Sequence, residues 1–178
     1  MKKQFSARSL ALGALMAALM CVLGPFSIPI GPIPVSLTPF VVSLAAMLLG
    51  GPLAAVSVVV YLLLGAVGLP VFSGFAGGLA KLVGPTGGYL VSFVLHALVG
   101  GLIAQKFQFK VLPSILGLAL GLLLDYILGT AWFMLQVHST LGHALKVCVL
   151  PFLPFDAVKI AGAVWLGRVL RRAIPKLN

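Results

Sequence analysis

The chain has 178 residues, of which 61% are hydrophobic and 8% are charged, and its mean hydropathy is +1.22. This composition excludes an ordinary soluble domain and is typical of an integral membrane protein. A formal net charge of +10 would suggest nucleic-acid binding in a soluble protein, but in a membrane protein basic residues set orientation, so no nucleic-acid partner is expected.

At about 20 apolar residues per crossing, the length predicts an all-α bundle of six transmembrane helices in one domain, residues 1–178. The first helix is predicted over residues 8–23. Its basic start and apolar run could also be a cleaved signal peptide. We favour a membrane helix because the rest of the chain is equally hydrophobic. Five prolines between Pro25 and Pro39 then exclude regular helix and predict a structured outer loop or a lid.

The remaining helices follow from apolar runs separated by glycine, proline or polar residues. They are predicted over residues 40–49, 53–67, 89–104, 112–135 and from about 151 or 154 to 169. Residues 40–49 are too few for a full crossing unless part of the preceding loop is also embedded. Gly50-Gly51-Pro52 is interpreted as a tight turn, residues 106–110 as a loop, and residues 138–143 as a polar turn.

Residues 65–89, GAVGLPVFSGFAGGLAKLVGPTGGY, are unusually rich in glycine for a membrane protein and contain one lysine, Lys81. Non-helical backbone at membrane depth has to be buried in protein or line a cavity. We therefore expect this glycine-rich stretch to build a pocket. The alternative is an irregular connector between helices.

The basic residues predict the orientation, because cytoplasmic loops hold an excess of Lys and Arg. With six helices and a cytoplasmic N-terminus, nine of the twelve basic residues fall on the cytoplasmic side: Lys2, Lys3, Arg8, Lys106, Lys110, Arg168, Arg171, Arg172 and Lys176. Both termini are then cytoplasmic. The proline-rich loop, the glycine-rich stretch and the start of the last helix meet at the outer side.

Few ionisable residues fall in the apolar segments, and such residues usually have a partner or a function. Asp156 and Lys159 are three residues apart, so they share a helix face and either pair with each other or bind a ligand with two polar ends. A structural salt bridge is the main alternative. Asp125, in the run LLLDY, fits either the same pocket or a structural tie, and its role stays open.

Several kinds of chemistry lack the residues they need. GPTGG (84–88) is followed by Tyr89 and not by the Lys-Ser/Thr pair of a phosphate-binding loop, so an ATP site is not expected. His96, His138 and His143 lack the spacing of a zinc site, and neither a metal nor another cofactor is expected. No motif of a catalytic centre is present, so we expect no catalytic residues and no enzyme activity.

Small residues mark two faces along which helices can approach closely. Ala14 and Ala18 form such a face on the first helix, where a partner protein or another helix of the bundle would fit equally well. For Gly117 and Gly121 we expect packing within the bundle.

GGLAKLVGPTGGYLVSF (77–93), with its signature GPTGGYL, and PFLPFDAVK (151–159) resemble the BioY family, the biotin-binding S components of energy-coupling factor (ECF) transporters. The likeness covers nearly the whole chain, although Phe155 stands where the family usually has glycine. It implies a six-helix S-component fold in a bacterial inner (plasma) membrane. It also implies biotin capture from outside, and import driven by an ECF transmembrane coupling subunit with two ATPase subunits.

The resemblance implies a role for each matching residue. Asp156 would accept the ureido N–H groups of biotin and Lys159 would bind its valerate carboxylate. The walls would come from Gly84, Thr86, Gly87, Gly88 and Tyr89, with Lys81 adding to the anion site, while Ala14 and Ala18 would dock on the coupling subunit. The alternatives are an S component for another vitamin, a self-sufficient proton-coupled carrier that uses Asp125 or Asp156, or a small intramembrane enzyme.

Overall fold

The computed structural model describes residues 7–30 and 33–174, which form eight helices and a two-stranded antiparallel ribbon. The predicted helical fold class is confirmed in this coarse form. In chain order the elements are α1 (Ala7–Leu23), β1 (Ser27–Ile28), β2 (Val35–Ser36), α2 (Thr38–Leu49), α3 (Gly51–Ala66), α4 (Leu79–Val83), α5 (Gly87–Lys106), α6 (Val111–Val137), α7 (Leu141–Cys148) and α8 (Leu153–Ala173).

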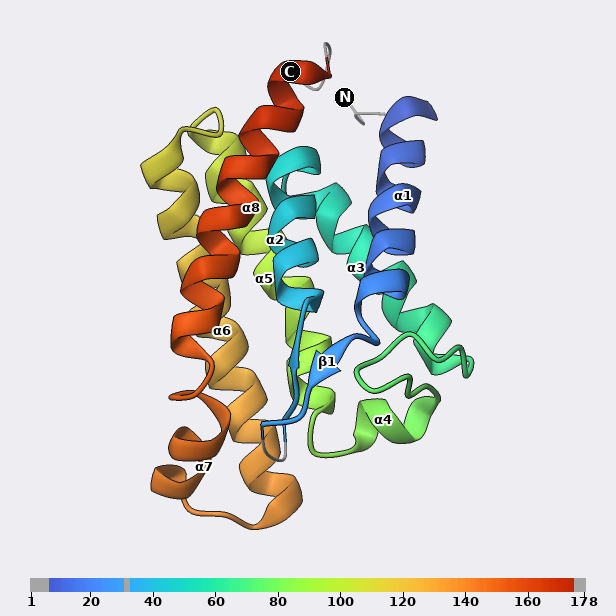
Figure 1. Cartoon of the computed structure of the whole chain (residues 1–178), viewed down its shortest axis with the longest axis vertical. Coiled ribbons are helices and arrows are strands. Elements are labelled where there is room, and N and C mark those ends of the chain that lie inside the picture. The colour runs from blue at the N-terminus through green and yellow to red at the C-terminus, as the bar shows by residue number, and fades with distance from the viewer. Residues whose placement is uncertain (1–6, 31–32, 175–178) are drawn as a thin grey trace.

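Six longer helices form the bundle, with α5 packed against α2, α3 and α6, and α8 packed against α2 and α6. The start of α1 and the end of α8 lie at one end of the bundle, which we call the terminal end (Figure 1). The β1–β2 ribbon, α4 and α7 lie at the opposite end, which we call the loop end (Figure 1). The proline-rich loop, the glycine-rich stretch and the start of α8 therefore do meet, as expected.

Two of the described helices, α5 and α6, are long and apolar enough to cross a membrane by themselves. A third span results if α7 and α8, which are bent by 49° at their junction, are counted together. Helices α1, α2 and α3 are apolar but shorter; the 12 residues of α2 extend only about 18 Å at 1.5 Å per residue. These apolar helices agree with the predicted membrane protein.

The tight turn predicted at residues 50–52 connects α2 to α3. Gly50 ends α2 with a φ of 74°, a left-handed conformation that favours glycine, and Pro52 lies in the first turn of α3. This turn packs against α5, because a Cβ built on Gly101 would lie 2.5 Å from the backbone nitrogen of Gly51. Helices α2 and α3 can approach α5 this closely only because Gly51 and Gly101 have no side chain.

Gly117 and Gly121 pack within the bundle, as predicted. A Cβ on Gly117 would lie 2.7 Å from Cβ of Ile103, and one on Gly121 would lie 2.8 Å from the carbonyl oxygen of His96. Both neighbours belong to α5, so these glycines set the spacing between α5 and α6.

Arg171 ties three elements together at the terminal end. Its Nη1 donates hydrogen bonds to the carbonyl oxygens of Leu48 (2.9 Å) and Met47 (3.3 Å) at the end of α2. Its guanidinium carbon lies 3.5 Å from the ring centroid of Phe109, in the turn between α5 and α6.

Lys106, predicted in that turn, is instead the last residue of α5, while Lys2, Lys3 and Lys176 lie outside the described residues.

Three short elements were missed by the sequence analysis. Within the proline-rich loop, Ser27 pairs with Ser36 and Ile28 with Val35, so the segment is a small ribbon. The glycine-rich stretch contains α4, because the first four residues of LAKLV are good helix formers and the run lies between two glycines. The predicted polar turn ends in α7, which begins where the side chain of Thr140 accepts a hydrogen bond from the backbone N–H of His143.

Candidate functional site

Asp156 and Lys159 lie at the start of α8, where the sequence FLPFDAVK brings them together. Pro154 lies in the first turn, and the backbone N–H of Asp156 donates to the carbonyl oxygen of Phe152, so the helix is established before the pair is reached. Lys159 Nζ lies 2.8 Å from Asp156 Oδ1, as the three-residue spacing predicted. The carboxylate also lies near the positive end of the α8 dipole, which favours negative charge.

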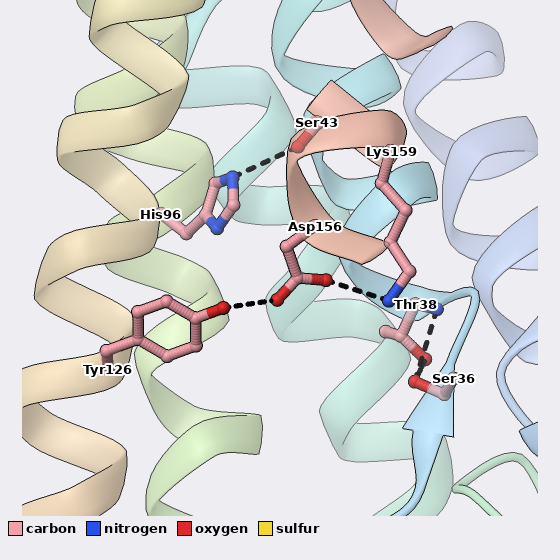
Figure 2. A network of polar contacts seen from close by, with 7 residues as sticks. All are labelled: Ser36, Thr38, Ser43, His96, Tyr126, Asp156 and Lys159. Carbon is pink, nitrogen blue, oxygen red and sulfur yellow. Dashed lines mark hydrogen bonds and ion pairs between the residues drawn. The ribbon is translucent and has the colours of Figure 1, made fainter. Parts of the chain in front are cut away.

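Asp156 joins α8 to α6 through its second oxygen. The hydroxyl of Tyr126 donates a hydrogen bond of 2.7 Å to Asp156 Oδ2. Figure 2 shows the carboxylate between the Tyr126 hydroxyl on one side and the Lys159 ammonium on the other. The side chains of Asp156 and Lys159 are only 5% and 11% exposed, so the pair is shielded from solvent and keeps most of its electrostatic strength.

The pair borders a cavity of about 50 Å³, which we call the inner cavity. It is lined by Ile33, Pro34, Ser36, Pro39, Tyr89, Phe93, Asp125, Tyr126, Cys148, Phe152, Asp156 and Lys159. A second cavity of about 50 Å³ shares the Pro34 and Tyr89 walls and is lined by Lys81 and Thr86 as well. Polar groups from both sequence motifs therefore converge on adjoining spaces.

A larger hollow of about 850 Å³ also borders the ribbon, and we call it the outer hollow. Its walls are mostly apolar and come from the ribbon and from residues 73–75, joined by Phe155 and Lys159. Lys159 and Ser36 border both the outer hollow and the inner cavity. Phe155 lies in regular α8 backbone, so the local conformation does not require glycine at this position.

The glycine-rich stretch contributes to the site in two ways. Lys81, Thr86 and Tyr89 line the second cavity, and the Tyr89 hydroxyl lies 2.8 Å from Thr130 Oγ1 of α6. Its glycines make close packing contacts. Trp132 Nε1 donates to the carbonyl oxygen of Gly84 at 2.9 Å, Gly88 packs on the Trp132 side chain, and Gly87 packs on the backbone of Leu82.

Asp125, whose role the sequence left open, is 2% exposed and lines the inner cavity. Ser92 Oγ of α5 donates a hydrogen bond to its Oδ1. Sequence reasoning missed Tyr126, Ser36 and Ser92 as parts of this region. Tyr126 had a usable signal, since it is a hydrogen-bonding side chain directly beside Asp125 in an otherwise apolar run.

A second polar contact lies deeper in the bundle. His96 Nε2 lies 3.1 Å from Ser43 Oγ, so the histidine joins α5 to α2 (Figure 2). Within residues 7–30 and 33–174, no group of three or more His, Cys, Asp or Glu side chains is placed to hold a metal ion. We interpret the contact between His96 and Ser43 as part of the packing of α5 against α2 in the core of the bundle.

The two candidate docking residues lie on the outside of α1. Ala14 and Ala18 are exposed, whereas the intervening Ala17 is buried, and Gly13 packs against Leu53 and Ser57 of α3. The small-residue face formed by Ala14 and Ala18 is thus directed away from the bundle.

A bundle of apolar helices with a buried acid–amine pair beside cavities at one end defines a helical membrane protein with a small polar site. A family model described as the BioY family matches residues 1–176. The chain belongs to the BioY family. The resemblance read from GPTGGYL and DAVK is thereby confirmed.

Relatives and a solved structure agree with this membership. The chain is 41% identical to "Biotin transporter BioY" of Thermotoga maritima, with 93% of this chain and 96% of that protein covered. It is 39% identical to "Probable biotin transporter BioY" of Pyrococcus horikoshii, with 93% and 97% covered. The crystal structure of the S-component for biotin from an ECF-type ABC transporter superposes with a TM-score of 0.87 at 29% identity, covering 97% of this chain and 95% of that one.

Proposed function

We propose that this protein is the biotin-binding subunit of a vitamin uptake transporter, and that it captures biotin from outside for ATP-driven import with ECF partner subunits. It carries no catalytic residues and no cofactor; biotin is its transported ligand. The observation that carries the proposal is the buried Asp156–Lys159 pair, which borders the inner cavity at the loop end of the bundle. The names of the relatives supply the identity of the ligand.

The chemistry of the pair suits the two polar ends of biotin. The ureido ring offers two N–H donors, which a carboxylate accepts, and the valerate ends in an anion, which an ammonium binds. Asp156 lines only the inner cavity among the three spaces, whereas Lys159 also borders the outer hollow. We therefore orient the ureido ring inward and the valerate toward the outer hollow.

The rest of the site would shape and close the pocket. Tyr89 and Phe93 would contact the bicyclic ring, because both line the inner and second cavities. Thr86 and Lys81 would add polar contacts in the second cavity, with Lys81 available to the carboxylate. Gly84, Gly87 and Gly88 would support the ligand through the backbone of the loop. The packing of these glycines on α4 and Trp132 fixes the position of that backbone.

We further propose that α1, α2 and α3 cross the membrane together with α5, α6 and α8, as a single six-helix domain. Both termini would be cytoplasmic and the protein a multi-pass component of the cell (plasma) membrane. The basic residues support this orientation, since Arg8, Lys106, Lys110, Arg168, Arg171 and Arg172 all belong to segments at the terminal end. The site at the loop end would then open to the outside.

The exposed face of Ala14 and Ala18 is the proposed contact with the ECF transmembrane coupling subunit, which would in turn bind two ATPase subunits. Small side chains at spacing i, i+4 let a partner helix approach closely within the bilayer. The exposure of both alanines on α1 supports this assignment.

Isothermal titration of the purified protein with biotin tests the proposal directly, and saturable, stoichiometric binding is expected. Titration with other vitamins is the control for an S component of different specificity, and only biotin should bind tightly. Uptake of biotin by the protein alone in liposomes, driven by a pH gradient without an ATPase, would instead support a self-sufficient carrier. Absence of biotin binding under conditions where the protein is folded would overturn the proposal.

Ligand entry requires movement of the ribbon. Small-molecule sites usually occupy about 300 Å³ or more, whereas the inner cavity measures about 50 Å³ and is walled by Pro34 and Ser36. Phe26, the residue directly before β1, also contacts the glycine-rich stretch, where its ring meets that of Phe75 edge to face at 5.6 Å. The proline-rich loop is therefore expected to act as a gate.

Spin labels at Ile30 and Leu135, which are 47% and 75% exposed, test this movement in a protein whose two native cysteines are replaced by alanine. Saturating biotin should change the distance distribution between them. A control pair at Leu112 and Val169, on α6 and α8, should report no change. Identical distributions for Ile30 and Leu135 with and without bound biotin would refute the gate.

A further inference from the structure

Asp125 lines the inner cavity together with Asp156 and Lys159, and the proposed contacts with biotin leave it unused. It lies on α6 next to Tyr126 and is 2% exposed. Its Oδ1 lies within hydrogen-bond reach of Ser92 Oγ, whose single proton can go either to this oxygen or to the carbonyl oxygen of Tyr89 at 3.0 Å, whereas no residue that the structure describes forms a hydrogen bond with Oδ2. One oxygen of this buried carboxyl group is therefore available to a ligand in the cavity.

The charges around the cavity favour an uncharged carboxyl group at this position. Two acids, Asp125 and Asp156, line the cavity, but its lining contains one cation, Lys159. That ammonium pairs with Asp156, whose other oxygen accepts from Tyr126. The other titratable groups in the lining, Tyr89, Tyr126 and Cys148, supply no positive charge. Burying a second carboxylate with no cation beside it is strongly unfavourable, so Asp125 is accommodated as the acid, with an O–H to donate.

We propose that Asp125 is a specificity-determining residue that donates a hydrogen bond from its carboxyl group to the ureido carbonyl oxygen of biotin. This inference rests on the proposed function and on the inward orientation of the ureido ring. The ring has two N–H donors and one carbonyl acceptor, and Asp156 can satisfy only the donors. A donor from Asp125 completes the set. A site whose buried polar groups match the ligand in this way discriminates against ligands that lack the matching group.

Three variants separate a ligand contact from a structural tie between α5 and α6. Asp125→Asn keeps a donor in nearly the same volume and should bind biotin within about threefold of the wild type. Asp125→Leu removes the donor and should weaken binding about tenfold or more, as expected for one buried hydrogen bond. Ser92→Ala breaks the α5–α6 contact and removes the partner of Oδ1 but keeps the donor, and should weaken binding less than Asp125→Leu does.

Infrared spectroscopy of biotin labelled with carbon-13 at the ureido carbonyl observes the contact itself. On binding to wild-type protein, the carbonyl stretch should shift to lower frequency, and in Asp125→Leu it should move back toward higher frequency. If the leucine variant does not fold, the wild type and Asp125→Asn suffice. The band of the protonated carboxyl group should be present in the wild type, shift when biotin binds, and be missing from Asp125→Asn.

The results distinguish failure of this inference from failure of the proposed function. If the wild type does not bind biotin, both fail. If the wild type binds biotin but Asp125→Leu has the same affinity, only the role of Asp125 is overturned. It is also overturned if Ser92→Ala weakens binding as much as Asp125→Leu does, or if the carboxyl band is absent or unchanged by biotin.

Discussion

Lys159→Met should weaken biotin binding by about 100-fold, because it removes the ammonium that we assign to the valerate carboxylate. Truncating one partner of a buried, hydrogen-bonded charge pair costs about 2–5 kcal/mol. The ammonium lies only 2.8 Å from Asp156, so the variant also leaves that carboxylate without its cation. Isothermal titration measures the affinity, and thermal unfolding in detergent checks that the variant is folded.

The methyl ester of biotin shows whether Lys159 contacts the valerate or only Asp156. The ester lacks the negative charge, so wild type should bind it more weakly than biotin, and Lys159→Met should reduce that preference. Asp156→Asn, by contrast, should weaken both ligands, because both retain the ureido N–H groups. Lys146→Met on α7 is the matched control, since Lys146 is exposed and its loss changes the net charge equally.

A purely structural salt bridge predicts a different pattern. Lys159→Met would then lower the thermal stability, since breaking a buried pair is destabilising by about 3–5 kcal/mol. The relative affinities for biotin and its methyl ester would stay as in the wild type. That result would remove Lys159 from the site and leave the assignment of the ligand to family membership alone.

The pair itself was predictable from sequence because helical periodicity is local. Residues 156 and 159 face the same side of any helix, and an acid and an amine so placed in an apolar segment have few other partners. The partner on α6 was not predictable in the same way. Tyr126 meets Asp156 only because α6 and α8 pack at a particular rotation and depth, which depend on contacts between residues far apart in the sequence.

The glycine-rich stretch shows a second limit. Its composition predicted irregular backbone, which the structure has over residues 67–78 and 84–86, and Lys81, Thr86 and Tyr89 line a cavity. Composition did not distinguish glycines that approach a ligand from glycines that approach protein. Gly88 lies against Trp132 and Gly87 against Leu82, so at least part of the glycine requirement comes from packing.

The short elements α4, α7 and the β1–β2 ribbon were missed for a related reason. Each has eight residues or fewer, and elements of that length are stabilised mainly by packing and weakly by their own propensity. The long helices were predicted within a few residues, because continuous apolar runs bounded by glycine and proline leave few alternatives.

Gly121→Ala should lower the thermal midpoint by about 2–12 °C, because its Cβ would lie 2.8 Å from the carbonyl oxygen of His96 and 3.1 Å from its Cα. These atoms are backbone, so rotation of a side chain cannot relieve the overlap, and α5 and α6 must separate. Overpacking of this kind costs about 1–3 kcal/mol, and each kcal/mol shifts the midpoint by about 2–4 °C in a chain of this size. Gly121→Leu should prevent folding.

Gly142→Ala is the control, because a Cβ at Gly142 in α7 meets no atom within 4 Å, and its midpoint should be unchanged or slightly raised.

The same two variants test whether the packing of α5 on α6 affects biotin binding. Asp125 and Tyr126 lie about one turn beyond Gly121 on α6, so separating α6 from α5 also displaces the Tyr126 hydroxyl from Asp156. Gly121→Ala should therefore weaken biotin binding as well as stability, whereas Gly142→Ala should weaken neither. A Gly121→Ala protein as stable as the wild type would mean that α5 and α6 lie farther apart than the structure shows.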